Sequence, residues 1–158
     1  MKHLVVYYSR TGTTKKVAQV ICSQLQADCE ELIDTKNRTG ILGFLRAGRE
    51  VGAKALTTLQ EPQYNPQDYD VVILGTPVWR NSVSTPVRTY ISQYKEQFKY
   101  VAFFSTQKSE KRDVLKELRD LCDQIPLASQ SIRENDVKQN SFLNELNSFI
   151  AAVKYVSN

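Results

Sequence analysis

Residues 5–18 read Val-Val-Tyr-Tyr-Ser-Arg-Thr-Gly-Thr-Thr-Lys-Lys-Val-Ala, a strand-like run that turns into a helical pattern. Its apolar first four residues are typical of a central strand in a parallel sheet. A turn rich in hydroxyl groups follows, and a helical pattern begins directly after it. Because free backbone N–H groups and the positive end of a helix point into such a turn, the stretch predicts a phosphate-binding site. An ordinary strand followed by a capped helix is the alternative interpretation.

The single glycine of this turn indicates which class of phosphate ligand it can bind. Gly12 has no partner at the spacing of a P-loop, and it stands alone where the dinucleotide fingerprint needs three glycines. The turn instead offers four hydroxyl groups, those of Ser9, Thr11, Thr13 and Thr14. A terminal monoester phosphate suits them best, because its oxygens accept several hydrogen bonds at once.

The same stretch resembles the signature of the flavodoxin-like FMN-binding family. Tyr7 stands at its aromatic position, Gly12 at its small position, and Ser9 and Thr14 at its hydroxyl positions. The resemblance implies that the turn binds the 5′-phosphate of FMN. The residues concerned are Ser9, Arg10, Thr11, Gly12, Thr13 and Thr14.

Strand-like runs alternate with helical patterns along the chain. The runs cover residues 3–8, 29–33, 71–74, 100–104 and, more weakly, 127–132. This alternation predicts a single α/β domain over residues 1–158, a three-layer sandwich with helices on both faces of a five-stranded parallel sheet. The flavodoxin-like strand order is 2-1-3-4-5, which brings the loops after strands one, three and four together.

Residues 75–81, Gly-Thr-Pro-Val-Trp-Arg-Asn, follow the third strand and carry the only tryptophan. A planar indole in a loop can stack on an isoalloxazine ring, although a surface tryptophan packed on a neighbouring helix is the alternative. The segment resembles the Thr-Pro-x-Trp loop that flanks the flavin in flavodoxin-like proteins. This resemblance assigns the ring site to Thr76, Pro77, Val78, Trp79, Arg80 and Asn81.

The charge of Arg80 and the composition of the third loop refine this prediction. A cation near the flavin stabilises the anionic reduced form, so Arg80 is expected to raise the reduction potential. In the family, the loop after the fourth strand covers the other flavin face, often with glycines or an aromatic residue. Both are missing here, which predicts an open face, and only Ser105, Thr106 and Gln107 carry over as cofactor-binding residues.

Residues 41–56 are the least regular part of the pattern. Gly43, Gly48 and Gly52 interrupt an otherwise helical stretch, and each costs up to about 1 kcal/mol relative to alanine. Either the helix packs closely on the sheet, or the segment is mobile and helps to form a surface for a partner or substrate.

Composition excludes several classes of protein. The net charge is +4, from 21 basic and 17 acidic residues without a block of one sign, so no nucleic-acid partner is expected. Cys22, Cys29 and Cys122 lack CxxC spacing and, with the single His3, predict reduced thiols and no metal site. No apolar stretch approaches a membrane span or a signal segment, which predicts a cytoplasmic protein.

Together these features predict an FMN-dependent oxidoreductase that passes electrons from a reduced donor such as NAD(P)H to a small acceptor. The flavin would carry the chemistry, so no side chain is assigned a catalytic role. Two alternatives stay open: a non-enzymatic electron carrier between redox partner proteins, and a flavodoxin-like scaffold without flavin. The residues do not indicate an oligomeric state.

Overall fold

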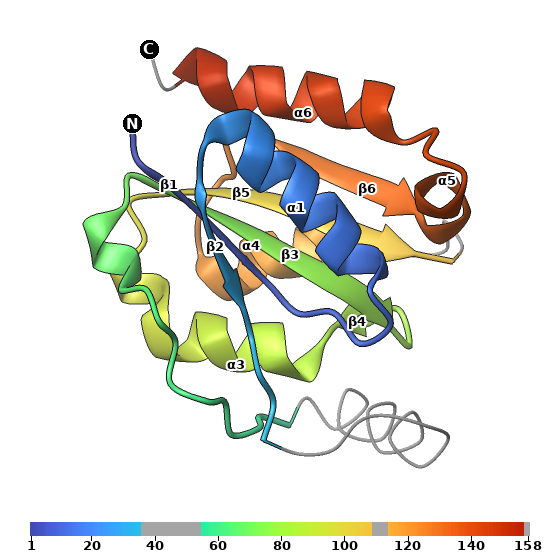
Figure 1. The fold of residues 1–158 in the computed structure, drawn as a ribbon. Helices are drawn as coiled ribbons and strands as arrows, with labels where there is room; N and C mark the ends of the chain where they lie inside the picture. Colours follow the sequence, from blue (N-terminus) through green and yellow to red (C-terminus); the bar gives the residue numbers. More distant parts are fainter. Residues whose placement is uncertain (36–54, 109–113, 157–158) are drawn as a thin grey trace.

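The computed structural model describes residues 1–35, 55–108 and 114–156 (Figure 1). Within these residues, five parallel strands form a sheet in the order β2-β1-β3-β5-β6, and the short β4 pairs antiparallel with β3. The strands are β1 (His3–Tyr7), β2 (Asp28–Glu31), β3 (Val71–Trp79), β4 (Ser82–Val83), β5 (Tyr100–Gln107) and β6 (Ser129–Arg133). Counting only the parallel strands, this is the predicted order 2-1-3-4-5, so the predicted fold class is confirmed.

Helices cover both faces of the sheet (Figure 1). They are α1 (Thr13–Leu25), α3 (Thr85–Tyr94), α4 (Val114–Cys122), α5 (Glu134–Lys138) and α6 (Leu143–Val156), with short 3₁₀ turns at Pro66–Asp68 and Lys95–Gln97. Alternate strand residues face opposite layers: Val5 packs with α1 and α6, whereas Leu4 and Val6 pack with α3 and α4. Both faces are therefore buried, as near-continuous apolar strands require.

The third strand extends further than predicted. Residues 75–79 continue β3 beyond the predicted 71–74, because they keep pairing with β5 as far as Pro77 opposite Thr106. The chain then reverses and pairs with itself, Val78 with Val83, to make β4. Trp79 thus ends a strand instead of lying in a loop. Of the irregular segment 41–56, all but the last two residues lie outside the described residues.

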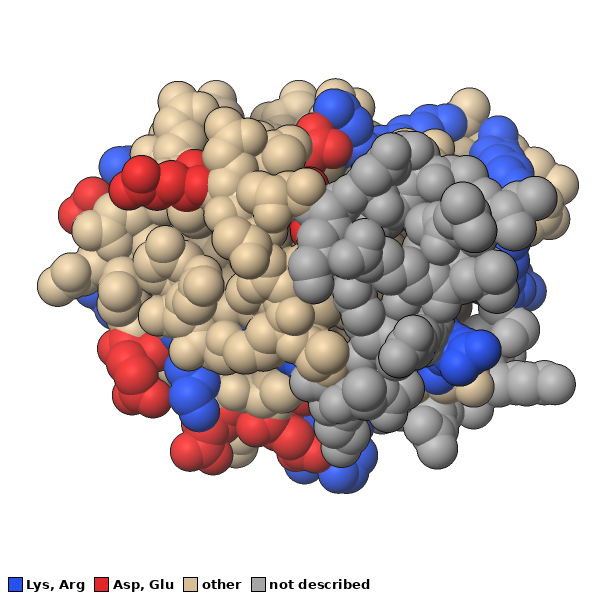
Figure 2. Space-filling view, turned by 90° about the horizontal axis from the view of Figure 1, so that it is seen from below, with Lys and Arg blue, Asp and Glu red and all other residues tan. Residues whose placement is uncertain are grey.

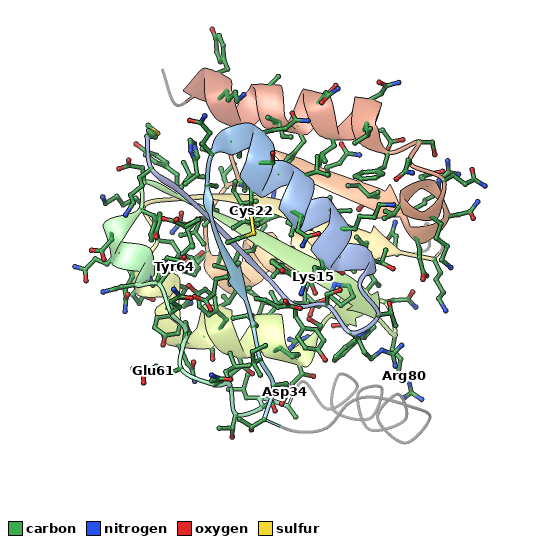
Figure 3. All side chains as sticks on the ribbon, in the orientation of Figure 1. Lys15, Cys22, Asp34, Glu61, Tyr64 and Arg80 are labelled. Carbon is green, nitrogen blue, oxygen red and sulfur yellow. A yellow bond between two sulfur atoms is a disulfide. The ribbon has the colours of Figure 1, made fainter. Side chains whose placement is uncertain are left out.

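The prediction of reduced thiols is wrong for two of the three cysteines. Cys22 and Cys29 form a disulfide between α1 and β2, with 6.1 Å between their Cα atoms (Figure 3). The tight return from helix to strand, in which the Ala27 N–H donates to the Cys22 carbonyl at 2.9 Å, brings them together. Cys122 is a buried free thiol, and burial raises its pKa to about 12, so it stays protonated at neutral pH.

None of the described helices has the length and apolar character needed to cross a membrane. Around the rim of the face shown in Figure 2, side chains of both charge signs are visible, and uncharged residues occupy most of its described centre.

Candidate functional site

A cavity of about 290 Å³ lies where β1, β3, β5 and β6 end. This is close to the lower end of the range for small-molecule pockets, roughly 300–1,000 Å³. The loops after β1, β3 and β5 converge on it, as the strand order requires. Its lining residues are Arg10, Thr11, Thr13, Thr14, Pro77, Val78, Trp79, Arg80, Asn81, Thr106, Gln107, Lys108 and Glu134.

The first loop forms a cradle at the start of α1. Gly12 precedes the helix with a φ of 93°, and its N–H donates to the Ser9 hydroxyl at 3.1 Å. Among the described residues no side chain caps the helix at Gly12, so the N–H groups of its first turn remain available to an anion. Ser9 and Gly12 shape the turn and do not line the cavity. The cavity is lined by the threonines of the same stretch, Thr11, Thr13 and Thr14.

Two buried hydroxyls connect the first loop to the third. Thr14 and Thr106 lie 1% and 4% exposed, and their Oγ1 atoms are 2.8 Å apart in a hydrogen bond that either can donate. This contact joins the first turn of α1, which follows β1, to the end of β5, and β3 lies between these two strands in the sheet. The side wall of the cradle is therefore set by tertiary structure.

Two other predicted residues support the strand ends and do not line the cavity. Thr76 is fully buried, and its hydroxyl donates to Ser84 Oγ at 3.0 Å. Ser105 is also fully buried and shares a hydrogen bond of 2.9 Å with Ser131 on β6. Their position suggests that they hold the loops in place.

A tight hairpin forms the second wall. Arg80 and Asn81 have φ values of 47° and 59° between the paired residues Trp79 and Ser82, which is the geometry of a type I′ turn. Figure 3 shows the Arg80 side chain extending away from the sheet at the tip of this hairpin. The Trp79 indole is only 8% exposed and packs edge-on against Tyr8, with 5.3 Å between ring centroids. Trp79 thus lines the cavity and also packs in the hydrophobic core.

Two residues of the cavity, Lys108 and Glu134, were not among those predicted from the sequence. Lys108 directly follows the predicted Gln107, so its position was available as a signal. Glu134 begins α5 after β6, the strand with the weakest pattern, and only the pairing of β6 with β5 brings it to the cavity.

The lining has the chemistry that a phosphorylated, planar ligand with polar edges requires. Three cations, Arg10, Arg80 and Lys108, outnumber the single carboxylate of Glu134, which favours a dianionic phosphate. Gln107 is 8% exposed, and its Oε1 has no hydrogen-bond partner among the described residues. A buried acceptor of this kind is costly unless a ligand or water donates to it. The residues present therefore fit FMN.

Alanine at position 12 is expected to lower the free energy of unfolding by about 1–2 kcal/mol. The cause is backbone strain alone. A Cβ at position 12 would meet no atom within 4 Å, but the alanine would have to adopt a φ of 93°. Urea unfolding of the FMN-free protein measures the loss. Gly12→Asn is the matched control, because asparagine tolerates this region better. Equal losses for both variants would contradict the strain argument.

A sequence profile of the family described as flavodoxin matches residues 46–148, which is more than half of the chain. The chain therefore belongs to the flavodoxin family, and the family predicted from the first two loops is confirmed. A comparison with curated protein sequences found no significant match.

Solved structures share the fold at low sequence identity. A flavoprotein from Lactobacillus acidophilus in complex with FMN is 22% identical over 92% of this chain and 98% of its own, with a TM-score of 0.72. An NADH:FMN oxidoreductase in its apo form is 14% identical over 96% and 87%, with a TM-score of 0.62. Two-electron reduced flavodoxin from Megasphaera elsdenii is 13% identical over 84% and 85%, with a TM-score of 0.56. At these identities the likeness shows the fold alone.

Proposed function

We propose that this chain binds FMN in the cavity and acts as an oxidoreductase that passes electrons from a reduced donor such as NAD(P)H to a small acceptor. The observation that carries the proposal is the convergence of a helix start, threonine hydroxyls and a cationic hairpin on one cavity. The FMN of the Lactobacillus acidophilus flavoprotein, which shares the fold, supports it. Bound FMN would supply the electron-transfer chemistry.

Each wall of the cavity has a distinct role in this proposal. The hydroxyls of Thr11, Thr13 and Thr14, with the N–H groups of the first turn of α1, hold the phosphate, and Arg10 adds charge. Residues 77–81, at the end of β3 and in the turn that follows, flank the ring on one side, and Thr106 and Gln107 line the other. Ser9, Gly12, Thr76 and Ser105 keep the loops in shape.

Two features support an enzyme over an electron carrier. Arg80 and Lys108 are exposed cations at the cavity, where a carrier of low potential would surround its flavin with acidic groups. The third loop carries no aromatic residue that could cover the second flavin face, and in this proposal a donor or acceptor approaches from that side. The NADH:FMN oxidoreductase that shares this fold is an example of such an enzyme and supports the proposal.

The decisive experiment is the visible absorption spectrum of the purified protein, followed by anaerobic titration with NADH, NADPH and dithionite. Flavin bands that are bleached by NADH or NADPH would support the oxidoreductase. Bands bleached by dithionite alone would favour a carrier between partner proteins. A colourless protein that takes up no added FMN would overturn the cofactor assignment and favour a scaffold.

Arg80→Ala is expected to lower the two-electron reduction potential of the FMN-loaded protein. A unit charge at 4 Å in a water-like surrounding contributes about 1 kcal/mol, which for two electrons is about 20 mV. Spectroelectrochemical titration measures the shift, and 1 M salt should shrink it. Arg80→Lys, which keeps the charge, should leave the potential nearly unchanged. Identical potentials for Arg80→Ala and the parent would refute this role.

A further inference from the structure

We propose that Arg88 and Glu117 are positioning residues for the hairpin of residues 78–83, and that their ion pair holds this hairpin at the ring side of the FMN site. The inference rests on the proposed function for its link to FMN. The orientation of the hairpin itself is argued from contacts between protein side chains and does not depend on FMN.

The carboxylate of Glu117 on α4 accepts hydrogen bonds from β4, the second strand of the hairpin. Its oxygens accept from the Ser82 hydroxyl at 2.8 and 2.9 Å, and Oε2 also accepts from the Val83 N–H at 3.1 Å. Both donors belong to β4, which is only two residues long. This one carboxylate therefore binds both residues of β4.

Arg88 on α3 completes the contact from the neighbouring helix. Its guanidinium donates to Glu117 Oε1 at 2.6 Å and to the Ser82 hydroxyl at 2.9 Å. Ser82 is thus held by both partners of the ion pair. Hairpin, α3 and α4 meet at a single hydrogen-bonded cluster.

The Arg88 side of the ion pair is buried and the Glu117 side is partly exposed, with side chains 7% and 26% exposed. An ion pair with a buried member repays the desolvation of that member poorly, so it is weak evidence of stability, and the best-attested use of such pairs is to select one arrangement. A two-stranded hairpin is marginal by itself and needs such outside support to hold one orientation.

The hairpin carries its own reporter. Trp79 is the only tryptophan of the chain and sits directly before the turn, 8% exposed beside Tyr8. Its fluorescence therefore follows the hairpin in the absence of FMN. A contact that only fastened α3 to α4 would leave this signal unchanged.

The test compares three variants of the full chain. Glu117→Gln removes the charge, and Ser82→Ala removes the hydroxyl of the hairpin while the Arg88–Glu117 pair stays. Asp120→Asn is the matched control, since it breaks an exposed pair with Lys116 on the same helix. Acrylamide quenching of Trp79 without FMN and the Kd for FMN are measured for each, with circular dichroism as a check of folding.

We expect Glu117→Gln to raise the quenching constant about twofold and the Kd for FMN about tenfold. Ser82→Ala should shift both in the same direction by about half as much on a logarithmic scale, and Asp120→Asn should match the parent. If Glu117→Gln fails to fold, Ser82→Ala decides alone. Folded variants with parental quenching would overturn the inference. Increased quenching in a chain that binds no FMN would support hairpin positioning and overturn the proposed function.

Discussion

Gly75→Ala is expected to lower the free energy of unfolding by about 2–3 kcal/mol, as overpacking of a well-packed core does. A Cβ at position 75 would lie 2.1 Å from Cζ of Phe104 and 2.5 Å from its Cε1. The two residues are direct register partners on β3 and β5, and the Phe104 ring is fully buried. Because the ring has little room to move aside, the central strands must shift.

Thermal unfolding should show this loss as a fall in Tm of about 5–10 °C. Phe104→Leu provides the coupled variant, since it removes the part of the ring that meets the new methyl group. The double variant Gly75→Ala/Phe104→Leu should lose less stability than the two single losses added together. Strict additivity, or a Gly75→Ala protein as stable as the parent, would show that the close approach of the two residues is unimportant.

Thr14→Val is expected to weaken FMN binding about 10- to 100-fold. Hydrogen bonds to charged groups contribute about 1.5–3 kcal/mol, and the Thr14 hydroxyl lies in the first turn of α1 on the wall of the cavity. Valine keeps the shape of threonine but removes the hydroxyl. Titration of the FMN-free protein with FMN, followed by flavin fluorescence, measures the Kd.

A second substitution separates binding from stability. Thr14→Val leaves the buried Thr106 hydroxyl without its partner at 2.8 Å, so the FMN-free variant should also lose about 1–2 kcal/mol of stability. Replacing both partners by valine should restore most of the stability, because no polar group is then stranded. FMN affinity should stay low in the double variant. Parental affinity in either variant would remove Thr14 from the phosphate site.

Much of the fold could be predicted because its signals are local. The apolar runs and the helical patterns between them identify five parallel strands, and right-handed crossovers leave few ways to order them. The hydroxyl-rich turn between β1 and α1 is continuous in sequence, so its residues are neighbours in any fold. The expectation that Trp79 lies in a loop failed for two reasons. Pairing with the distant β5 extends β3 as far as Pro77, and the hairpin with β4 then pairs Trp79 with Ser82.

The alternation of strands and helices and the cradle before α1 are readable in the sequence, because both depend on residues close together in the chain. The rest of the site forms only when distant parts of the chain pack together. Glu134 reaches the cavity only through the pairing of β6 with β5, and Ser82 meets Glu117 across 35 residues of chain. Such contacts follow from the packing of whole elements, and no short pattern of residues encodes them. The Cys22–Cys29 disulfide is different, because it spans seven residues and forms at the turn from α1 into β2.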